Sequence, residues 1–188
     1  MTYSIAEAAV FVKMKMTIKH IDLCMFNVVE LSYFRTTRWA MNINQKNIKA
    51  YDKKADNYDN TYDGKFTEKF KSLLLAAVEI KDGYSVLDIG CGNGTLLSRF
   101  AENKSIKGFG TDLSPKMIEN AKVRHPELQF AIADCENIPF DDGSMDIITV
   151  CAAYHHFPNV HAFAAEAKRL LKKRGSLYIA EIYLPPII

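Results

Sequence analysis

The sequence predicts a doubly wound α/β fold, a mostly parallel sheet with helices on both of its faces. Two observations lead to this prediction. From Tyr84 onward, short apolar runs typical of buried strands alternate with amphipathic segments typical of helices, and such an alternation builds right-handed crossovers between parallel strands. The chain has 188 residues, of which 48% are hydrophobic and 24% charged, as expected for one globular domain.

The first part of the chain is harder to assign. Residues 5–12 could form a short helix, whereas the alternation of Met14, Met16 and Ile18 with polar residues is typical of a strand. Residues 42–63 are polar and contain several tyrosines, and residues 66–77 repeat apolar side chains at helical spacing. We therefore expect three parts, listed as an N-terminal extension over residues 1–41, a helical lid over residues 42–80 and an α/β domain over residues 81–188.

Strands and helices follow one another along the α/β domain. The predicted strands are the apolar runs at residues 84–89, 108–111, 128–133, 145–151 and 176–182. A helix is predicted over residues 95–102, and another begins at Ser114-Pro115, an N-cap followed by proline at the first helical position. A further helix follows from Val160, and the basic residues 172–174 with Gly175 are expected to end it.

Charge, apolar runs and cysteine spacing exclude several classes of protein. The net charge is +2, with a small basic excess in residues 1–41, which is too little for a dedicated nucleic-acid binder. The longest apolar run, Leu73–Val78, is too short to cross a membrane, and no secretory signal pattern is present. The cysteines form no CxxC pair, so neither a disulfide framework nor a metal site is expected. We expect a cytoplasmic protein with no nucleic-acid or membrane partner.

A glycine-rich turn joins the first strand of the α/β domain to the next helix. Its sequence is Asp88-Ile89-Gly90-Cys91-Gly92-Asn93-Gly94. Glycines at such a turn let a ligand approach the backbone amides at the positive end of the helix. The spacing is GxGxG rather than GxGxxG, and Asp88 stands where an NAD-binding fold tends to have an apolar residue. A carboxylate at this point favours a cationic ligand.

Two further carboxylates follow neighbouring strands. Asp112, at the end of the second strand, can accept hydrogen bonds from both hydroxyls of a ribose, and Asp134, after the third, can accept one from an adenine amino group. Because the carboxyl ends of parallel strands meet at one edge of a sheet, these two residues and Asp88 are expected around one crevice. Alternatively, Asp112 and Asp134 could be turn residues and Asp88 could cap loop amides.

Segments in matching order and register give the chain a resemblance to a known family. They are VLDIGCGNG, GTDLSPKMIENAK, ADCENIPFDDGSMDIITV and LLKKRGSLYIAEI, within a similarity that extends from Ile48 to Ile182. The chain resembles class I S-adenosylmethionine-dependent methyltransferases of the methyltransferase type 11 group, and is similar to the ubiquinone/menaquinone-biosynthesis C-methyltransferases. The resemblance implies a Rossmann-like fold, S-adenosyl-L-methionine as cofactor, and a transferase that methylates an unidentified, small-molecule acceptor by in-line displacement.

The resemblance also implies roles for single residues. Those implied to bind the cofactor are Asp88, Gly90, Cys91, Gly92, Gly94, Asp112, Leu113, Asp134, Cys135, Cys151, Tyr51 and Tyr58. In the resembling family, the position of Asp88 and the glycine loop hold the methionine part, that of Asp112 the ribose, and the adenine lies against the position of Leu113. Tyr51 and Tyr58 belong to a segment that looks like the family's lid, although both could simply be packing residues.

Two adjacent histidines, His155 and His156, follow the fourth strand, where the transferred methyl group is expected to point. A histidine near its ordinary pKa could remove a proton from the acceptor during catalysis. The alternative is that one of them packs and positions the loop. Two other functions stay open: a cofactor-binding protein that is catalytically incomplete, and an NAD-dependent oxidoreductase.

The end of the sequence departs from the resembling fold, which has seven strands. Strands six and seven are expected to be absent, which would leave the fifth predicted strand as an exposed edge with unpaired backbone groups. A truncated chain, a second copy in a homodimer, or residues 1–41 could account for this edge, and the first two are favoured.

Overall fold

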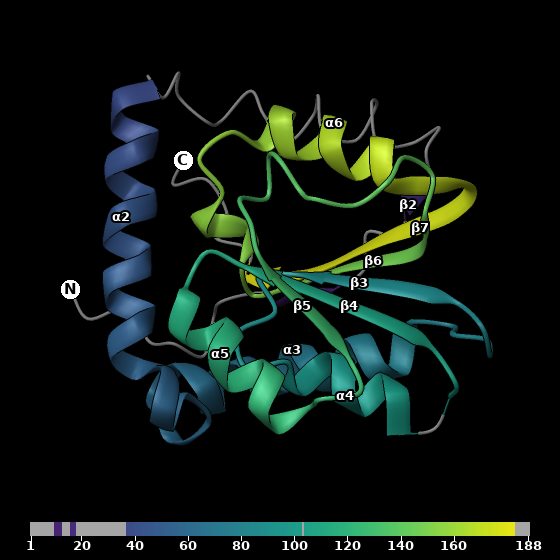
Figure 1. Cartoon of the computed structure of the whole chain (residues 1–188), viewed down its shortest axis with the longest axis horizontal. Helices are drawn as coiled ribbons and strands as arrows, with labels where there is room; N and C mark the ends of the chain where they lie inside the picture. The colour runs from purple at the N-terminus through teal and green to yellow at the C-terminus, as the bar shows by residue number, and fades with distance from the viewer. Residues whose placement is uncertain (1–9, 13–15, 18–36, 103, 183–188) are drawn as a thin grey trace.

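The computed structural model describes residues 10–12, 16–17, 37–102 and 104–182 of the chain. Figure 1 shows a twisted sheet at the centre, with α6 on one face, α3, α4 and α5 on the other, and α2 standing across one end. No helix in these ranges is long and apolar enough to cross a membrane.

The parallel part of the sheet fits the predicted doubly wound arrangement. Its strands are β3 (Ser85–Ile89), β4 (Lys107–Asp112), β5 (Gln129–Ile132), β6 (Met145–Cys151) and β7 (Leu171–Ile182). They lie in the order β7-β6-β3-β4-β5, and each neighbouring pair is parallel. The chain turns one way from β3 through β4 to β5 and the other way through β6 to β7, so a crevice for ligands is expected at the carboxyl ends of β3 and β6. The predicted fold class is confirmed.

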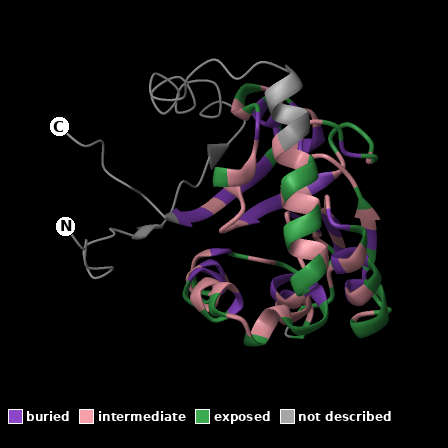
Figure 2. Cartoon of the chain, turned by 90° about the vertical axis from the view of Figure 1, so that its left-hand side faces the viewer, coloured by how far each residue is buried: buried purple, intermediate pink, exposed green. Residues whose placement is uncertain are grey.

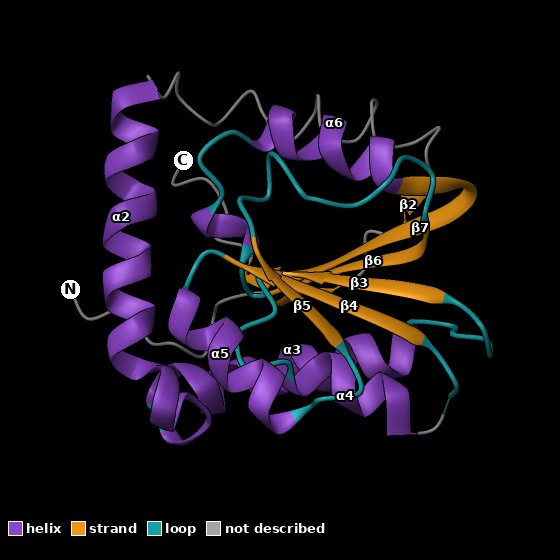
Figure 3. Ribbon diagram, in the orientation of Figure 1, coloured by secondary structure: helices purple, strands orange, loops and turns teal. Residues whose placement is uncertain are grey.

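Helices cover both faces of this sheet, as predicted (Figure 3), and they bury apolar side chains against it. The helices of the α/β domain and the one before it are α3 (Tyr62–Ala77), α4 (Thr95–Glu102), α5 (Pro115–Arg124) and α6 (Val160–Leu170). Phe70, Leu97 and Ile118 of the first three helices belong to one apolar cluster with β3, and Phe163 of α6 to the cluster on the opposite face. Each such side chain contributes roughly 1.5–3 kcal/mol through burial.

The ends of α5 and α6 show how far local sequence decides these elements. Ser114 caps α5 as predicted, because its hydroxyl accepts a hydrogen bond from the backbone N–H of Met117 at 3.1 Å. The last strand was predicted to start at Ser176, but β7 starts five residues earlier, at Leu171, directly after α6 ends. Leu171 pairs with Met145 and Ser176 with Ile147, so residues 172–175 bulge opposite a single residue of β6.

The edge of β7 is covered by the N-terminal extension. β1 (Val10–Val12) and β2 (Met16–Thr17) both pair with β7 in the antiparallel sense, with Val10 opposite Ile182 and Met16 opposite Leu177. Val10–Val12 is thus a strand and not part of a helix, because the free N–H and C=O groups of β7 offer it partners. This outcome is the explanation that the sequence favoured least, and it removes the reason for expecting a second copy at this edge. Residues 37–41 of the extension belong to the helix that follows, and its other residues, 1–9, 13–15 and 18–36, lie outside the described ranges.

The helical region before β3 consists of α2 (Thr37–Lys54), the 3₁₀ segment η2 (Ala55–Asn60) and α3. α2 therefore begins before residue 42, where the helical region was predicted to start. None of residues 43–54 is fully buried, and pairs of half-buried and exposed residues alternate along them. In Figure 2, which is viewed from the side of α2, the helix is coloured as intermediate and exposed, whereas much of the sheet behind it is coloured as buried. α2 is therefore attached to the domain without forming part of its apolar core.

Candidate active site

A cavity opens at the carboxyl ends of the parallel strands, next to α2. It encloses about 1000 Å³ of empty space, part of it open to solvent. Its wall comes from the loops after β3, β4, β5 and β6 and from the helical region. The predicted residues in this wall are Asp88, Gly90, Cys91, Gly92, Asp112, Leu113, Cys135, Cys151, Tyr51, Tyr58 and His156. Gly94, Asp134 and His155 are not among the lining residues.

Asp88 is a buried carboxyl group at the end of β3. It is 1% exposed, and its Oδ1 accepts a hydrogen bond of 2.6 Å from the Thr149 hydroxyl on β6. Burial raises the pKa of Asp88 to about 7, and the hydrogen bond from Thr149 and the charge of Lys71 offset only part of that rise. A carboxyl group in this environment is stabilised in its charged form when a cation enters the cavity.

The glycine loop adopts backbone conformations that other residues rarely adopt. Gly90, Gly92 and Gly94 all have positive φ, at 74°, 53° and 78°. A Cβ atom on Gly90 would lie 2.6 Å from that of Ala153, and one on Gly94 would lie 2.7 Å from the Phe130 ring. The GxGxG spacing therefore follows from the shape of the turn. Gly94 fills a structural position in it, while Gly90 and Gly92 present their backbone to the cavity.

Asp112, at the end of β4, joins the glycine loop to the start of α5. Its Oδ2 accepts a hydrogen bond from the backbone N–H of Gly92, and its Oδ1 accepts one from that of Ser114, both at 2.9 Å. Burial raises the pKa of Asp112, and these backbone hydrogen bonds act against the rise. Each carboxylate oxygen can accept more than one hydrogen bond, so Asp112 can also accept two hydroxyl donors from a ligand.

Asp134 and Cys135 follow β5, and they have different surroundings. Cys135 is 6% exposed and lines the cavity. Asp134 has both oxygens engaged elsewhere: Oδ2 accepts from Asn44 Nδ2 of α2 at 2.8 Å, and Oδ1 accepts from the backbone N–H of Glu136 at 3.1 Å. In this structure Asp134 therefore holds α2 in place.

The adjacent histidines face different partners. His156 Nε2 lies 2.7 Å from the Tyr51 hydroxyl of α2, and burial lowers the pKa of His156 to about 4. Burial raises the pKa of Tyr51 well above its ordinary value, so at neutral pH the hydroxyl donates and the uncharged histidine accepts. His155 instead places Nδ1 2.9 Å from Glu181 Oε2, at the end of β7. Only His156 is in a position to contact a ligand in the cavity.

The helical region supplies lining residues that the sequence analysis missed, above all Lys71 of α3 and Asn47 of α2. Lys71 is a lysine on the buried face of its helix, with Phe70 before it and Leu74 one turn later, a pattern that could have indicated it. Its Nζ lies 3.7 Å from Glu68 Oε2. Asn47 has no such sequence signal, because its position depends on how α2 meets the sheet.

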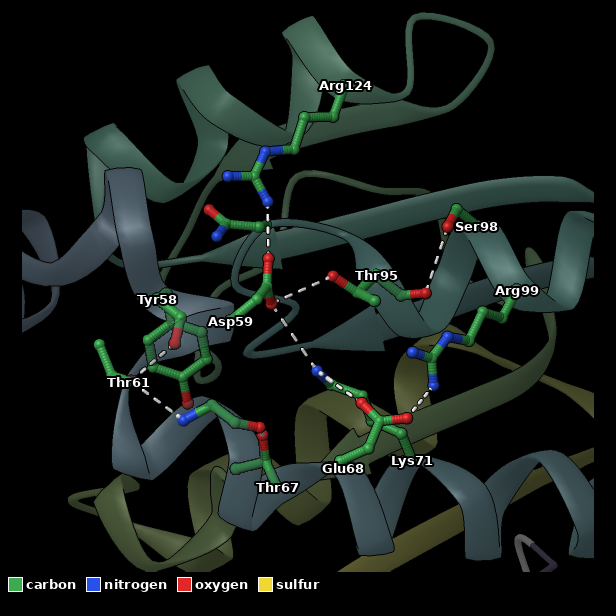
Figure 4. A network of polar contacts seen from close by, with 12 residues as sticks. Tyr58, Asp59, Thr61, Thr67, Glu68, Lys71, Thr95, Ser98, Arg99 and Arg124 are labelled. Carbon is green, nitrogen blue, oxygen red and sulfur yellow. Dashed lines mark hydrogen bonds and ion pairs between the residues drawn. The ribbon is translucent and has the colours of Figure 1, made fainter.

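A network of polar contacts joins η2 to the helices of the α/β domain (Figure 4). Asp59 accepts a hydrogen bond from Arg124 Nη1 of α5 at 2.7 Å and one from the Thr95 hydroxyl of α4 at 3.5 Å. Its Oδ1 also lies 3.9 Å from Lys71 Nζ. Next to it, Glu68 of α3 pairs with Arg99 of α4. Asp59, Thr95 and Lys71 also line the cavity, so the network reaches its wall.

Comparison with known proteins agrees with this geometry. Residues 87–179, which contain the glycine loop and Asp112, match a sequence family described as a methyltransferase domain. These residues form a methyltransferase domain. The match includes β4, β5 and β6 completely and parts of β3 and β7, and it confirms the resemblance that the sequence showed.

The curated relatives of this chain are longer than the region that matches them. The demethylmenaquinone methyltransferase of Thermotoga maritima is 34% identical over 149 residues, which make up 74% of this chain and 62% of the relative. The ubiquinone/menaquinone biosynthesis C-methyltransferase UbiE of Paraburkholderia phymatum is 32% identical over 139 residues, which make up 68% of this chain and 56% of the relative. The chain thus spans less than two thirds of the length of these relatives.

A solved structure shares the fold of the methyltransferase domain. It is a chain in a complex that contains the Trm112 methyltransferase activator of Haloferax volcanii. The two chains superpose with a TM-score of 0.64 and 30% identity, over 70% of this chain and 59% of the other. The Rossmann-like architecture is therefore shared by a protein of clearly related sequence.

Proposed function

We propose that this chain is an S-adenosylmethionine-dependent methyltransferase that acts on a small-molecule acceptor. One observation carries the proposal: Asp88, which favours a cation, and Asp112, which can accept two hydroxyl donors, line the same cavity at the ends of neighbouring strands. S-adenosylmethionine has a cationic methionine end and a ribose, and it supplies a methyl group activated by its positively charged sulfur.

Polar atoms in the cavity fit the methionine end of this cofactor. Asp88 would face its ammonium group, and Lys71, which is 9% exposed, would face its carboxylate. Asn93 of the glycine loop donates from Nδ2 to the Ala55 carbonyl at 3.1 Å, and its buried Oδ1 has no hydrogen-bond partner among the described residues. An acceptor without a partner in the wall of a cavity is explained by a ligand that donates to it.

The other end of the cavity fits the nucleoside. Asp112 would accept the ribose hydroxyls, and the adenine would lie between Leu113 and Cys135, which line the cavity after β4 and β5. Cys151 would lie near the sulfur, at the end of β6. These assignments follow the family's arrangement, and the cavity supports them because the residues line it in the expected order along the sheet edge.

Methyl transfer asks the protein mainly to align and desolvate the reacting groups, since the leaving group is already activated. We assign this task to Tyr51 and His156, whose hydrogen bond connects α2 to the loop after β6 and closes the cavity on that side. His156 is uncharged at neutral pH, so it could also accept a proton from the acceptor once it has released Tyr51. We expect no direct catalytic contact from His155, which faces Glu181.

The acceptor is proposed by class. The relatives from Thermotoga maritima and Paraburkholderia phymatum are named for menaquinone and ubiquinone methylation, and Tyr51, Tyr58 and Phe157 give this cavity aromatic walls. A planar, aromatic small molecule of the quinol type is therefore the first acceptor to assay.

We also propose a cytoplasmic location, because Cys91, Cys135 and Cys151 are free thiols. Recovery of the chain in an exported fraction would contradict this location.

Calorimetric titration with S-adenosylmethionine and S-adenosylhomocysteine tests the function, with Asp112→Asn as the matched variant. We expect binding by the wild-type chain, weakened at least tenfold in the variant because a carboxylate oxygen and its charge are lost. A folded wild-type chain that binds neither compound would contradict the proposal.

Transfer of a labelled methyl group to a demethylated quinol would establish the activity. Binding without transfer to any acceptor in a broad panel would favour the cofactor-binding, catalytically incomplete alternative.

A further inference from the structure

Besides the hydrogen bond between Tyr51 and His156, two further contacts attach α2 to the α/β domain. Near its middle, Asn44 Nδ2 donates to Asp134 Oδ2 after β5 at 2.8 Å. Two turns later, Asp52 Oδ1 accepts from the Ser114 hydroxyl at 2.5 Å and from the backbone N–H of Lys116 at 3.2 Å, at the start of α5. Figure 1 shows the result: α2 stands across one end of the sheet, next to α5.

The residues of α2 between these points face the cavity. Asn47, Ile48 and Tyr51 line it, and with Asn44 they follow the i, i+3, i+4, i+7 spacing of one helix face. The opposite face, with Lys46 and Lys49, is exposed, and so is Gln45 at its side. Since Asn44 contacts Asp134, which precedes Cys135, and Tyr51 contacts His156 after β6, Asn47 lies between these contacts along the helix, next to the part of the cavity assigned to the nucleoside.

The side-chain amide of Asn47 is incompletely satisfied. Its Nδ2 is buried and has no hydrogen-bond partner among the described residues. A buried donor without a partner costs about 1–3 kcal/mol, and an apolar side chain in the same place would avoid that cost. Such a group is explained when a ligand that enters the cavity accepts its hydrogen bond.

We propose that Asn47 recognises the adenine of the cofactor by donating a hydrogen bond from Nδ2 to a ring nitrogen. The inference rests on the proposed function, and it adds a specificity residue from α2 to the residues of the sheet edge. An asparagine amide suits an adenine edge, because it offers a donor for a ring nitrogen and an acceptor for the amino group. Asp134, which was expected to accept from that amino group, is not among the residues that line the cavity.

The test compares S-adenosylhomocysteine with its 1-deaza, 3-deaza and 7-deaza analogues, each of which lacks one ring nitrogen. Their binding to the wild-type chain, to Asn47→Ala and to the control Gln45→Ala is measured by calorimetry. We expect Asn47→Ala to weaken S-adenosylhomocysteine binding about 3- to 10-fold, as one neutral hydrogen bond requires, and Gln45→Ala to leave it unchanged. One deaza analogue should bind the wild-type chain more weakly than S-adenosylhomocysteine does, by a similar factor. The same analogue should bind Asn47→Ala as tightly as S-adenosylhomocysteine does.

The thermal midpoint of the free protein separates recognition from a structural role. If Asn47 serves the ligand, Asn47→Leu removes an unsatisfied donor and keeps or raises the midpoint while it weakens binding. A structural residue would instead lower the midpoint. Unchanged affinity in Asn47→Ala, or equal losses for every deaza analogue in both proteins, would overturn this inference. If the wild-type chain binds no S-adenosylhomocysteine, the proposed function and this inference fail together; if it binds, only the inference is at risk from these variants.

Discussion

Two regions enclose the cavity, and they are stabilised in different ways. The strand-end loops, residues 88–94 and 112–114, are held by backbone geometry and buried carboxyl groups, as in the hydrogen bonds of Asp112 to the N–H groups of Gly92 and Ser114. The lid, which we propose consists of α2 and η2 (residues 37–60), is held largely by half-exposed side chains, such as Tyr51 on His156. The strand-end loops therefore form a rigid part of the site, which we call the platform. We expect the lid that covers it to open at a low cost in free energy, because half-exposed polar contacts are individually weak.

The two regions also respond to pH with opposite signs. Burial raises the pKa of Asp88 to about 7 in the platform and lowers the pKa of His156 to about 4 at the lid contact. From about pH 4 to 7 the folded chain holds a proton on Asp88 that the unfolded chain has lost, so this group's contribution to stability declines as the pH rises. From about pH 6.5 down to 4 the unfolded chain protonates His156 and the folded chain does not, so this contribution declines as the pH falls.

The largest expected effect comes from the platform. Gly90→Ala places a side chain at positive φ and 2.6 Å from the Cβ of Ala153, so we expect a loss of about 3 kcal/mol in the free energy of unfolding, together with loss of S-adenosylhomocysteine binding. Gly143→Ala is the matched control, because Gly143 also has positive φ, at 59°, but has open space around it. It should cost about 1 kcal/mol. Urea denaturation measures both, and equal costs would show that the loop is less tightly packed than the platform requires.

The second effect concerns the charge of Asp88. If a ligand ammonium requires the ionised carboxylate, affinity for S-adenosylhomocysteine should rise about fivefold from pH 6 to pH 7, since a group with a pKa of about 7 goes from about one tenth to one half ionised. Calorimetry within this range stays below the pKa of the ligand's own amino group, which is about 7.7 or higher. Asp88→Asn should bind more weakly at pH 7 and lose this pH dependence. A wild-type affinity that is flat over the same range would place the ammonium elsewhere.

The third effect belongs to the lid. Because His156 is kept uncharged, the thermal midpoint of the wild-type chain should fall more steeply from pH 6.5 to pH 5 than that of His156→Asn, by roughly 3–6 °C, which corresponds to about 1.6 kcal/mol. His161→Asn is the control, since His161 is an exposed histidine at the start of α6. If both variants lose stability with pH in the same way, burial of His156 does not contribute to holding the lid.

The same contrast explains what the sequence could predict. The platform depends on residues close together in the chain, so GxGxG, Asp88 and the Ser114-Pro115 start of α5 were enough to predict it. The lid depends on pairs far apart, such as Asn44 with Asp134, and nothing in the local pattern indicates them. His155 and His156 looked equivalent in the sequence, but the 3₁₀ turn η3 (Tyr154–His156) directs them to different partners. β2 lies in the alternating stretch that the sequence indicated as strand-like, whereas β1 lies in residues 5–12, which could equally have formed a short helix. The pairing of both is decided by the free edge of β7.

The smallest expected effect tests whether the lid is a weakly held cover. Asp59 connects η2 to α4 and α5 through Thr95 and Arg124, but its side chain is 37% exposed, so its ion pairs are partly screened by water and are worth about 1 kcal/mol or less. Asp59→Asn should therefore weaken S-adenosylhomocysteine binding by no more than about threefold in low salt, and by less in 1 M salt, where the Debye length is about 3 Å. Asp63→Asn is the control, because Asp63 pairs with Lys54 and both side chains are 42% exposed, at a site outside the cavity wall. A loss in the Asp59 variant that is much larger and independent of salt would mean that η2 belongs to the rigid platform, and the distinction between platform and cover would then have to be drawn at α2 alone.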